Sequence, residues 1–142
     1  MYDRGASMKI NIRTYTTSDK DSLNILLKEV YGLEKEDNTT NNIEIVAVYN
    51  DQIIGYLTIN KLYDSVRNIN YAFLNYVCVK KEYRNKGIAS NMLEYVFNIC
   101  KKLNISYIEL TSNDKRIEAQ YLYQNMGFSI RETNVFRKEI LW

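Results

Sequence analysis

The sequence predicts one α/β (α+β) domain in which helices flank a mixed, mostly antiparallel sheet of about seven strands. The first reason is size, since 142 residues with 46% apolar content suit a single hydrophobic core. The second is the alternation of segments with a period of two residues and segments at helical spacing. The third is a strand, helix and strand in succession over 70–111, which requires two parallel strands joined by a right-handed crossover. Residues 1–7 show no periodicity and are expected to be a leader or an expression remnant, so the single domain is assigned to 8–142.

The first half of the chain predicts a strand, a helix and a β-hairpin. The segments concerned are a strand (10–14), a helix (18–32), a loop (34–42) and two further strands (43–49 and 52–62). Ser18, with Asp21 three residues later, has the spacing of a helix N-cap pair, and Gly32 stands where a helix C-cap is expected. Asn50-Asp51 is a favourable two-residue hairpin turn.

The second half predicts the parallel pair and the end of the sheet. The segments are a strand (70–79), a helix (90–103), a strand (105–111), a helix (116–126) and two last strands (128–131 and 134–141). The strand 70–79 is the most continuously apolar, which is typical of a central strand. The predicted order is therefore β-α-β-β-β-α-β-α-β-β.

Composition excludes several classes of function. A net charge of +2 with scattered Lys and Arg disfavours nucleic-acid binding, and no apolar run is long enough to cross a membrane. The two cysteines, Cys78 and Cys100, have no disulfide or zinc-site spacing, so we expect a cytoplasmic protein that binds no metal. The chain contains no histidine, which excludes Ser-His-Asp, Cys-His and H-E-x-x-H chemistry.

The segment Arg84-Asn85-Lys86-Gly87-Ile88-Ala89 lies between the strand 70–79 and the helix that follows. A strand, a turn whose glycine lets the backbone come close, and the start of a helix bring several N–H groups toward one point. This arrangement predicts a site for an anion, and a pyrophosphate is the expected ligand.

The order of elements, the R-x-x-G-x-A turn at Arg84 and the later segment Ala119-Gln120-Tyr121-Leu122-Tyr123-Gln124-Asn125-Met126-Gly127-Phe128 resemble the GNAT-type N-acetyltransferases. The resemblance covers 8–142 and implies the GNAT fold, with the parallel fourth and fifth strands splayed apart. It implies acetyl-CoA as co-substrate, with its pyrophosphate held by the turn. Two departures are expected to affect cofactor affinity more than function: Lys80-Lys81 replaces a proline-acid pair, and Arg116 stands where many members have asparagine.

The resemblance also implies a set of site residues. The backbone of Val77 and Val79 would pair with the pantetheine arm, Asn113 would lie near its amides, and Tyr123 would face the thioester sulfur. The residues that would bind the cofactor are Val77, Cys78, Val79, Arg84, Asn85, Lys86, Gly87, Ile88, Ala89, Ser90 and Asn113.

The reaction expected is direct attack of an amine on the thioester. The backbone N–H of Val77 or Cys78 would stabilise the developing oxyanion, and Tyr123 would donate a hydrogen bond to the leaving sulfur. Nothing near Cys78 in the sequence would lower its pKa, so a covalent route through this thiol is rejected. The general base stays open between Glu109, Asp64 and a water held by Tyr76.

The acceptor and the assembly are also open. The acceptor is expected to be a primary amine of a small molecule or a peptide, and the acidic residues Glu34, Glu36 and Asp37 either attract it or form a solvated loop. The alternative function is a non-catalytic acetyl-CoA-binding sensor or interaction module, which the presence of Tyr123 disfavours. A homodimer through the apolar C-terminal strand ending at Trp142 is a further option.

Overall fold

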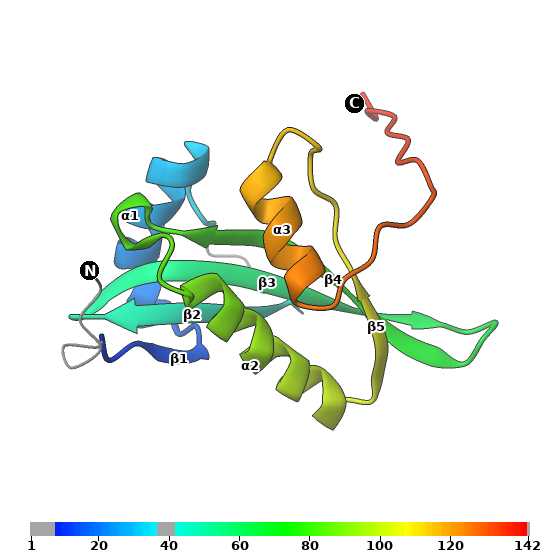
Figure 1. The fold of residues 1–142 in the computed structure, drawn as a ribbon, viewed down its shortest axis with the longest axis horizontal. Coiled ribbons are helices and arrows are strands. Elements are labelled where there is room, and N and C mark those ends of the chain that lie inside the picture. Colours follow the sequence, from blue (N-terminus) through cyan, green and yellow to red (C-terminus); the bar gives the residue numbers. More distant parts are fainter. Residues whose placement is uncertain (1–7, 37–41, 142) are drawn as a thin grey trace. The chain divides into compact units, whose positions relative to one another are not determined.

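The computed structural model describes residues 8–36 and 42–141 and divides into two compact units (Figure 1). The first unit extends to Thr111 and contains the sheet, and the second, residues 112–142, contains one helix. The expected leader at 1–7 and the acidic residue Asp37 lie outside the described residues. Among the described helices, none combines the length and the apolar character that a bilayer crossing requires.

The elements of the first unit follow the predicted order. They are β1 (Asn11–Thr14), the 3-10 turn η2 (Thr17–Asp19), α1 (Lys20–Tyr31), β2 (Ile43–Tyr49), β3 (Gln52–Asp64), β4 (Ile69–Val79), the 3-10 turn η3 (Lys81–Tyr83), α2 (Ile88–Lys102) and β5 (Ile105–Glu109). The second unit contains α3 (Ile117–Asn125).

The sheet has the order β1-β2-β3-β4-β5, and each strand lies beside its neighbour in sequence. The first three pairs are antiparallel, whereas β4 and β5 are parallel and joined through α2, as predicted. The hairpin turn between β2 and β3 places Asn50 and Asp51 at φ of 49° and 60°, the left-handed conformation that Asn and Asp tolerate. The mixed, mostly antiparallel GNAT-type sheet is therefore confirmed.

The number of strands is smaller than predicted. The described sheet has five strands, and the segments 128–131 and 134–141 form no regular structure. The first segment alternates apolar and polar residues, whereas 134–141 does not, and a strand also needs a neighbour to receive its N–H and C=O groups. The described part of the second unit contains no other strand to supply that ladder.

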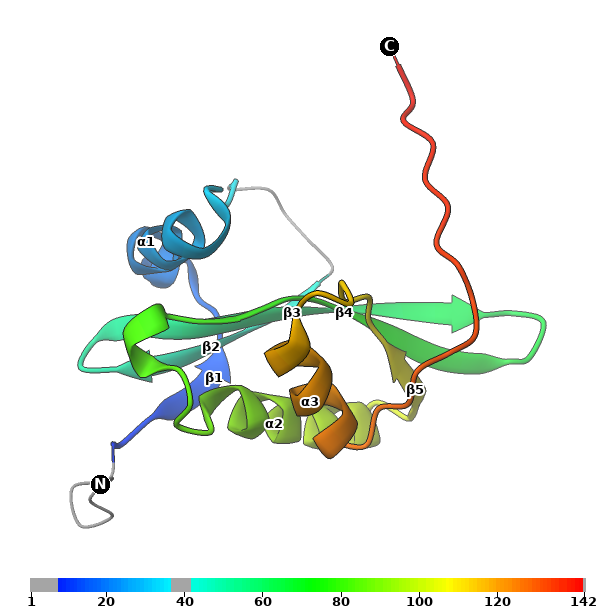
Figure 2. The same cartoon turned by 45° about the horizontal axis from the view of Figure 1, so that its top comes forward.

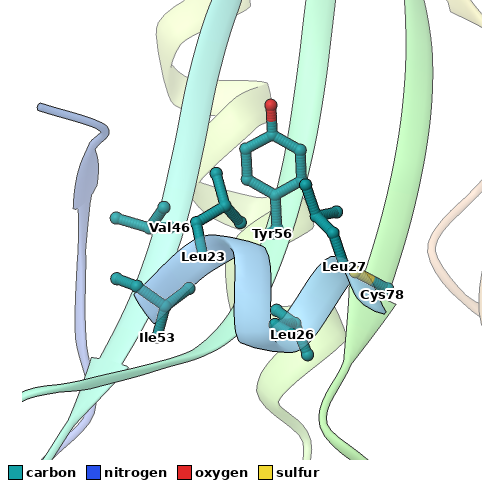
Figure 3. Packing of buried hydrophobic residues seen from close by; sticks show 7 residues of the cluster. All are labelled: Leu23, Leu26, Leu27, Val46, Ile53, Tyr56 and Cys78. Atoms are coloured by element: carbon teal, nitrogen blue, oxygen red, sulfur yellow. The ribbon is translucent and has the colours of Figure 1, made fainter. Parts of the chain in front are cut away.

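One face of the sheet is covered by α1 (Figure 2). Three leucines of this helix, Leu23, Leu26 and Leu27, are buried against side chains from three strands (Figure 3). The strand residues of this cluster are Val46, Ile53, Tyr56 and Cys78. Gly32 ends the helix as predicted, at φ 67°, with its N–H donating to the carbonyl of Lys28.

The opposite face is covered by α2, which crosses the sheet closely because β3 carries a glycine at the crossing. A Cβ atom at Gly55 would lie 2.9 Å from Cε of Met92 and 3.1 Å from Cβ of Ala47. Met92 is fully buried, so its side chain has little room to move away. Gly55 therefore sets how near α2, and the turn that precedes it, can lie to the sheet.

The start of α1 is anchored to β1 by a two-pronged ion pair. Nη1 and Nη2 of Arg13 donate to the two carboxylate oxygens of Asp19 at 2.7 and 2.8 Å, and the backbone N–H of Thr16 donates to Oδ2 at 2.8 Å. The predicted Ser18–Asp21 cap is wrong, because Arg13 draws Asp19 into the capping position and a 3-10 turn precedes the helix. The hydrogen bonds from Arg13 lower the pKa of Asp19 from its ordinary 3.8 to about 2.

The first prediction concerns acid stability. A carboxyl whose pKa is lowered on folding stabilises the fold fully above its unfolded pKa and loses that contribution as the pH falls through the folded value. We expect Asp19 to contribute about 2 kcal/mol, lost between about pH 4 and pH 2. Urea unfolding of Asp19→Asn should therefore differ from wild type by this amount at neutral pH, and much less at pH 2.

The control is Asp51→Asn, which keeps a residue that tolerates the left-handed turn and should leave the pH dependence unchanged. A constant difference between Asp19→Asn and wild type across this pH range would contradict the role given to the ion pair.

The second prediction concerns Gly55. Gly55→Ala should destabilise the fold by about 1 kcal/mol net, because overpacking against Met92 outweighs the backbone entropy that alanine saves. In a Met92→Ala background the same change should cost close to nothing. Thermal unfolding of the four proteins in this double-mutant cycle measures the difference, and an equal cost in both backgrounds would refute the close approach.

Candidate functional site

The turn between β4 and α2 is fixed to the end of the strand by Arg84. Its Nε donates to the carbonyl of Val79 at 2.9 Å. Asn85 and Gly87 both adopt positive φ, 62° and 79°, so the backbone reverses twice within four residues. This succession of conformations turns consecutive N–H groups toward one side, as in anion-binding nests.

The first turn of α2 presents N–H groups that the helix itself does not use. The first hydrogen bond of the helix runs from the N–H of Asn91 to the carbonyl of Gly87 at 3.0 Å, so the N–H groups of Ile88, Ala89 and Ser90 precede it. Gly87 is the N-cap, and no side chain caps this end. No atom lies within 4 Å of a Cβ placed on Gly87. The helix dipole and these donors fit a phosphate group that approaches closely.

A bulge interrupts β4 just before this turn. Tyr56 pairs with Cys78 and Thr58 with Asn75, so two residues of β4, Tyr76 and Val77, stand opposite one residue of β3. Tyr76 has φ 58°, a left-handed conformation that is strained for a bulky side chain. Strain of this kind persists only where the surrounding structure imposes it, and its place beside the turn marks a functional region.

The outer edge of β4 is open beyond the bulge. Pairing with β5 ends at Phe73 and Glu109, whereas pairing with β3 continues to Val79. The N–H of Lys80 donates to the carbonyl of Ile54 in β3 at 2.7 Å. Because backbone groups alternate along a strand, the N–H of Val79 points to the opposite, open edge.

The carbonyls along this edge already have protein partners. That of Val79 accepts from Arg84, and that of Val77 accepts from the hydroxyl of Tyr31 at 3.4 Å. The N–H groups, more than the carbonyls, are therefore the part of this edge that suits a ligand.

The last turns of α1 hold both the strand and the turn through contacts that the sequence analysis missed. Glu29 accepts from Nζ of Lys80 at 3.3 Å and from the backbone N–H of Lys81 at 3.1 Å. The ring of Tyr31 meets that of Tyr76 edge to face, with centroids 5.4 Å apart. The hydrogen bond from the backbone N–H of Lys81 lowers the pKa of Glu29 below its usual value. The hydrogen bond from the side chain of Lys80 lowers this pKa further, by a smaller amount. No local motif marks Glu29, because its partners are more than fifty residues away.

A second group that the sequence did not indicate joins β2, β3 and the segment after α1. The hydroxyl of Tyr56 donates to Oε1 of Glu44 at 2.6 Å, and Nζ of Lys35 lies 3.2 Å from the same oxygen and 5.1 Å from the ring centre of Tyr15. Figure 3 shows this hydroxyl pointing away from the leucines of α1. Burial first, and then the hydrogen bond to Glu44, raise the pKa of Tyr56. These groups are mutually satisfied, which suits a structural role.

The three candidates for the general base have different surroundings. Asp64 accepts from the N–H groups of Val66 and Arg67 and from the Arg67 side chain, so it shapes the β3–β4 turn. Glu109 ends β5 and is exposed, and Tyr76 stands at the bulge. Of the acidic loop residues, Glu34 pairs with Lys28 at 2.8 Å on the surface.

Tyr123 and Asn113 belong to the second unit. Asn113 begins the turn into α3, with its side-chain oxygen accepting from the N–H of Lys115 at 2.9 Å. Two bonds close the helix end, from Gly127 to the carbonyl of Gln124 and from Phe128 to the carbonyl of Tyr123. With Gly127 at φ 93° and the rings of Tyr123 and Phe128 in contact at 5.7 Å, this is a Schellman motif. The G-F pair of the sequence therefore orients the Tyr123 ring.

Neither metal nor cysteine chemistry has support in the part of the chain that the structure describes. Within 8–36 and 42–141, no three His, Cys, Asp or Glu side chains are grouped to hold a metal ion. Cys78 is buried in the cluster under α1, beside the leucines of that helix.

Comparisons with known proteins agree with this geometry. The sequence model of the Acetyltransferase (GNAT) family matches residues 9–128. A stretch of 66 residues, 46% of this chain, is 33% identical to GCN5-related N-acetyltransferase 6, chloroplastic, of Arabidopsis thaliana and covers 23% of it. A stretch of 89 residues, 59% of this chain, is 31% identical to the Uncharacterized protein YxbD of Bacillus subtilis (strain 168) and covers 56% of it. The chain thus spans between about a quarter and about half of these curated relatives.

The fold is shared with solved structures at low sequence identity. The ribosomal-protein-alanine N-acetyltransferase from Brucella melitensis biovar Abortus 2308 superposes with a TM-score of 0.78 at 14% identity, over 92% of this chain and 99% of that chain. The family match takes in most of this sequence, from just before the first strand to three residues beyond the last helix. The protein therefore belongs to the GNAT family of acetyltransferases.

Proposed function

We propose that this acetyltransferase moves the acetyl group of acetyl-CoA to a primary amine of a small molecule or a peptide by direct attack. The observation that carries the proposal is the uncapped start of α2, which follows directly on the open edge of β4. The uncapped start of the helix suits a diphosphate, and the open strand edge suits an extended chain with amide groups. Coenzyme A contains a diphosphate followed by such a chain.

Each part of the coenzyme has a proposed partner. The N–H groups from Arg84 to Ser90 bind the pyrophosphate, with Lys86 adding positive charge at the exposed surface of the turn. The N–H groups of Val77 and Val79 bind the pantetheine amides, and Asn113 contributes from the second unit. Lys80 contributes less to this charge, because Glu29 pairs with it.

The chemistry requires an oxyanion donor, an acid and a neutral amine. Disruption of the β4 ladder supports the N–H of Val77 as the donor, because the N–H of Cys78, two residues before that of Lys80, faces β3. Tyr123 is the proposed hydrogen-bond donor to the leaving sulfur. Burial of Cys78 in the cluster under α1 supports direct attack over an acetyl-cysteine route.

The acceptor's own pKa decides how much help from a base is needed. Neutralising a lysine-like amine at pH 7 costs about 4.6 kcal/mol, whereas an α-amine costs about 1 kcal/mol. The turn contacts of Asp64 make it the least suitable base, and Glu109 pairs with Phe73, four positions before Val77, so a water on Tyr76 stays as the candidate.

The third prediction tests the anion site with two substitutions of equal size. Asn and Asp both tolerate positive φ, so Gly87→Asn and Gly87→Asp place similar side chains at the N-cap of α2. Only Asp adds a negative charge where the pyrophosphate is proposed to bind. We expect the dissociation constant of acetyl-CoA, by calorimetry, to rise about tenfold or more from Asn to Asp.

Protein stability provides the control for this pair. An acid at a helix N-terminus is favourable, so Gly87→Asp should unfold at a temperature equal to or above that of Gly87→Asn. Equal acetyl-CoA affinities for the two variants would place the diphosphate elsewhere.

The fourth prediction tests Tyr123. Tyr123→Phe keeps the ring contact with Phe128 but removes the hydroxyl, so kcat should fall about tenfold to a hundredfold while acetyl-CoA affinity stays within twofold. Tyr121→Phe, in the same helix and 65% exposed, is the matched control and should match wild type. Release of free thiol from acetyl-CoA in the presence of amines measures kcat for both variants. An unchanged kcat in Tyr123→Phe would remove the acid role.

A further inference from the structure

The helix α1 covers only part of its face of the sheet. Side chains two residues apart in a strand share a face, so the face on which Tyr56 meets α1 continues along β3 beyond the helix. The β3 residues that follow on this face are Thr58, Asn60 and Leu62, and their partners in β4 are Asn75, Phe73 and Tyr71. This extension therefore brings Phe73 and Tyr71 to the side of the sheet that carries α1.

Aromatic rings line this uncovered part. Tyr71 stacks on Tyr107 of β5, with centroids 5.2 Å apart and planes at 22°. Tyr107 is 39% exposed and Tyr76, which touches Tyr31 of α1, is 48% exposed. Tyr71, Phe73, Tyr76 and Tyr107 are called the aromatic strip. It runs along β4 and β5, which lie side by side (Figure 1), and ends at the bulge.

One carboxylate lies within the aromatic strip. Glu109 pairs with Phe73 across the β4–β5 ladder, so it shares the face of that ring. Its side chain is exposed, and among the residues that the structure describes it has no ion pair. A carboxylate beside aromatic rings suits a cation, which gains both the ion pair and the attraction of the ring faces.

The position of Glu109 decides which cation it can hold. Val77 follows Phe73 by four positions, and one of the three residues between them is the extra residue of the bulge. Three strand steps of about 3.3 Å, with one strand spacing of about 4.8 Å to the side, give about 10 to 11 Å between Glu109 and the proposed oxyanion donor. The reacting nitrogen must lie next to that donor, so Glu109 is too far away to bind it and suits a second cationic group.

We propose that the acceptor is a diamine-type molecule, with a second cationic group about 10 Å from its reacting amine and a largely apolar chain between them. Glu109 binds the second cation, and the aromatic strip covers the chain. The inference rests on the proposed function, because the reacting end is placed by the oxyanion donor at Val77. It deepens that function by naming the class of acceptor.

The experiment compares acceptors that differ at one end. Diaminooctane, whose extended chain spans about this distance, is tested beside aminooctanol, which replaces the second ammonium with a hydroxyl, and beside diaminobutane and diaminododecane. Wild type should acetylate diaminooctane with a kcat/KM about fivefold to tenfold above that of aminooctanol, mostly through KM. Diaminobutane, which is too short, should behave like aminooctanol.

Variants then locate the effect. Glu109→Gln should bring diaminooctane down to the level of aminooctanol and leave aminooctanol within twofold, whereas Glu94→Gln, on the exposed side of α2, should match wild type. Tyr107→Ala should raise KM for diaminooctane about threefold, and Tyr107→Phe, which keeps the ring, should restore it. Because these side chains are exposed, melting temperatures should stay close to wild type.

The outcomes separate this inference from the proposed function. Failure of the full-length protein to bind acetyl-CoA by calorimetry would overturn both. Acetyl-CoA binding with no preference for diaminooctane over aminooctanol, whether in turnover or in calorimetric binding to the coenzyme A complex, would overturn the acceptor assignment alone. A preference that survives Glu109→Gln would also overturn it.

Discussion

The site depends on the unequal pairing of the two edges of β4. Toward β3 the ladder runs to Val79, and toward β5 it stops at Phe73. Unpaired backbone groups in a sheet are costly unless water or a ligand satisfies them, so the edge left open between two strands of a mixed sheet is a candidate ligand site. The bulge at Tyr76 turns this edge, and the turn at Gly87 brings the N-terminus of α2 to its end.

The surroundings of this edge keep it in place from both faces. On one side, α2 lies close to the sheet at Gly55, which positions the N-terminus of the helix. On the other side, α1 holds the strand and the turn through Tyr31 and Glu29. The strain at Tyr76 is opposed on the α1 side by the contact of its ring with that of Tyr31.

Periodicity was sufficient to predict the order of the elements up to the fifth strand and the parallel pair, and the glycine at position 87 predicted the turn before α2, because each leaves a local pattern in the sequence. The bulge leaves no such pattern, since tyrosine at position 76 does not indicate a left-handed backbone. Glu29 and the Glu44–Lys35 pair were missed, because their partners lie far along the chain or on another element. The last two strands were predicted wrongly for another reason: the short alternation at 128–131 and the apolar residues of 134–141 do not reveal whether a neighbouring strand exists.

The contact between Glu29 and the N–H of Lys81 has a consequence for protein engineering. Acceptor preference in a fold of this kind invites exchange of the first helix between homologous enzymes. Here the exchange would also remove the carboxylate of Glu29, which holds the loop that is proposed to bind the coenzyme. Chimeras with a changed acceptor preference would then also bind the acyl donor more weakly. They would keep this affinity only if an acidic residue is retained at that single helical position.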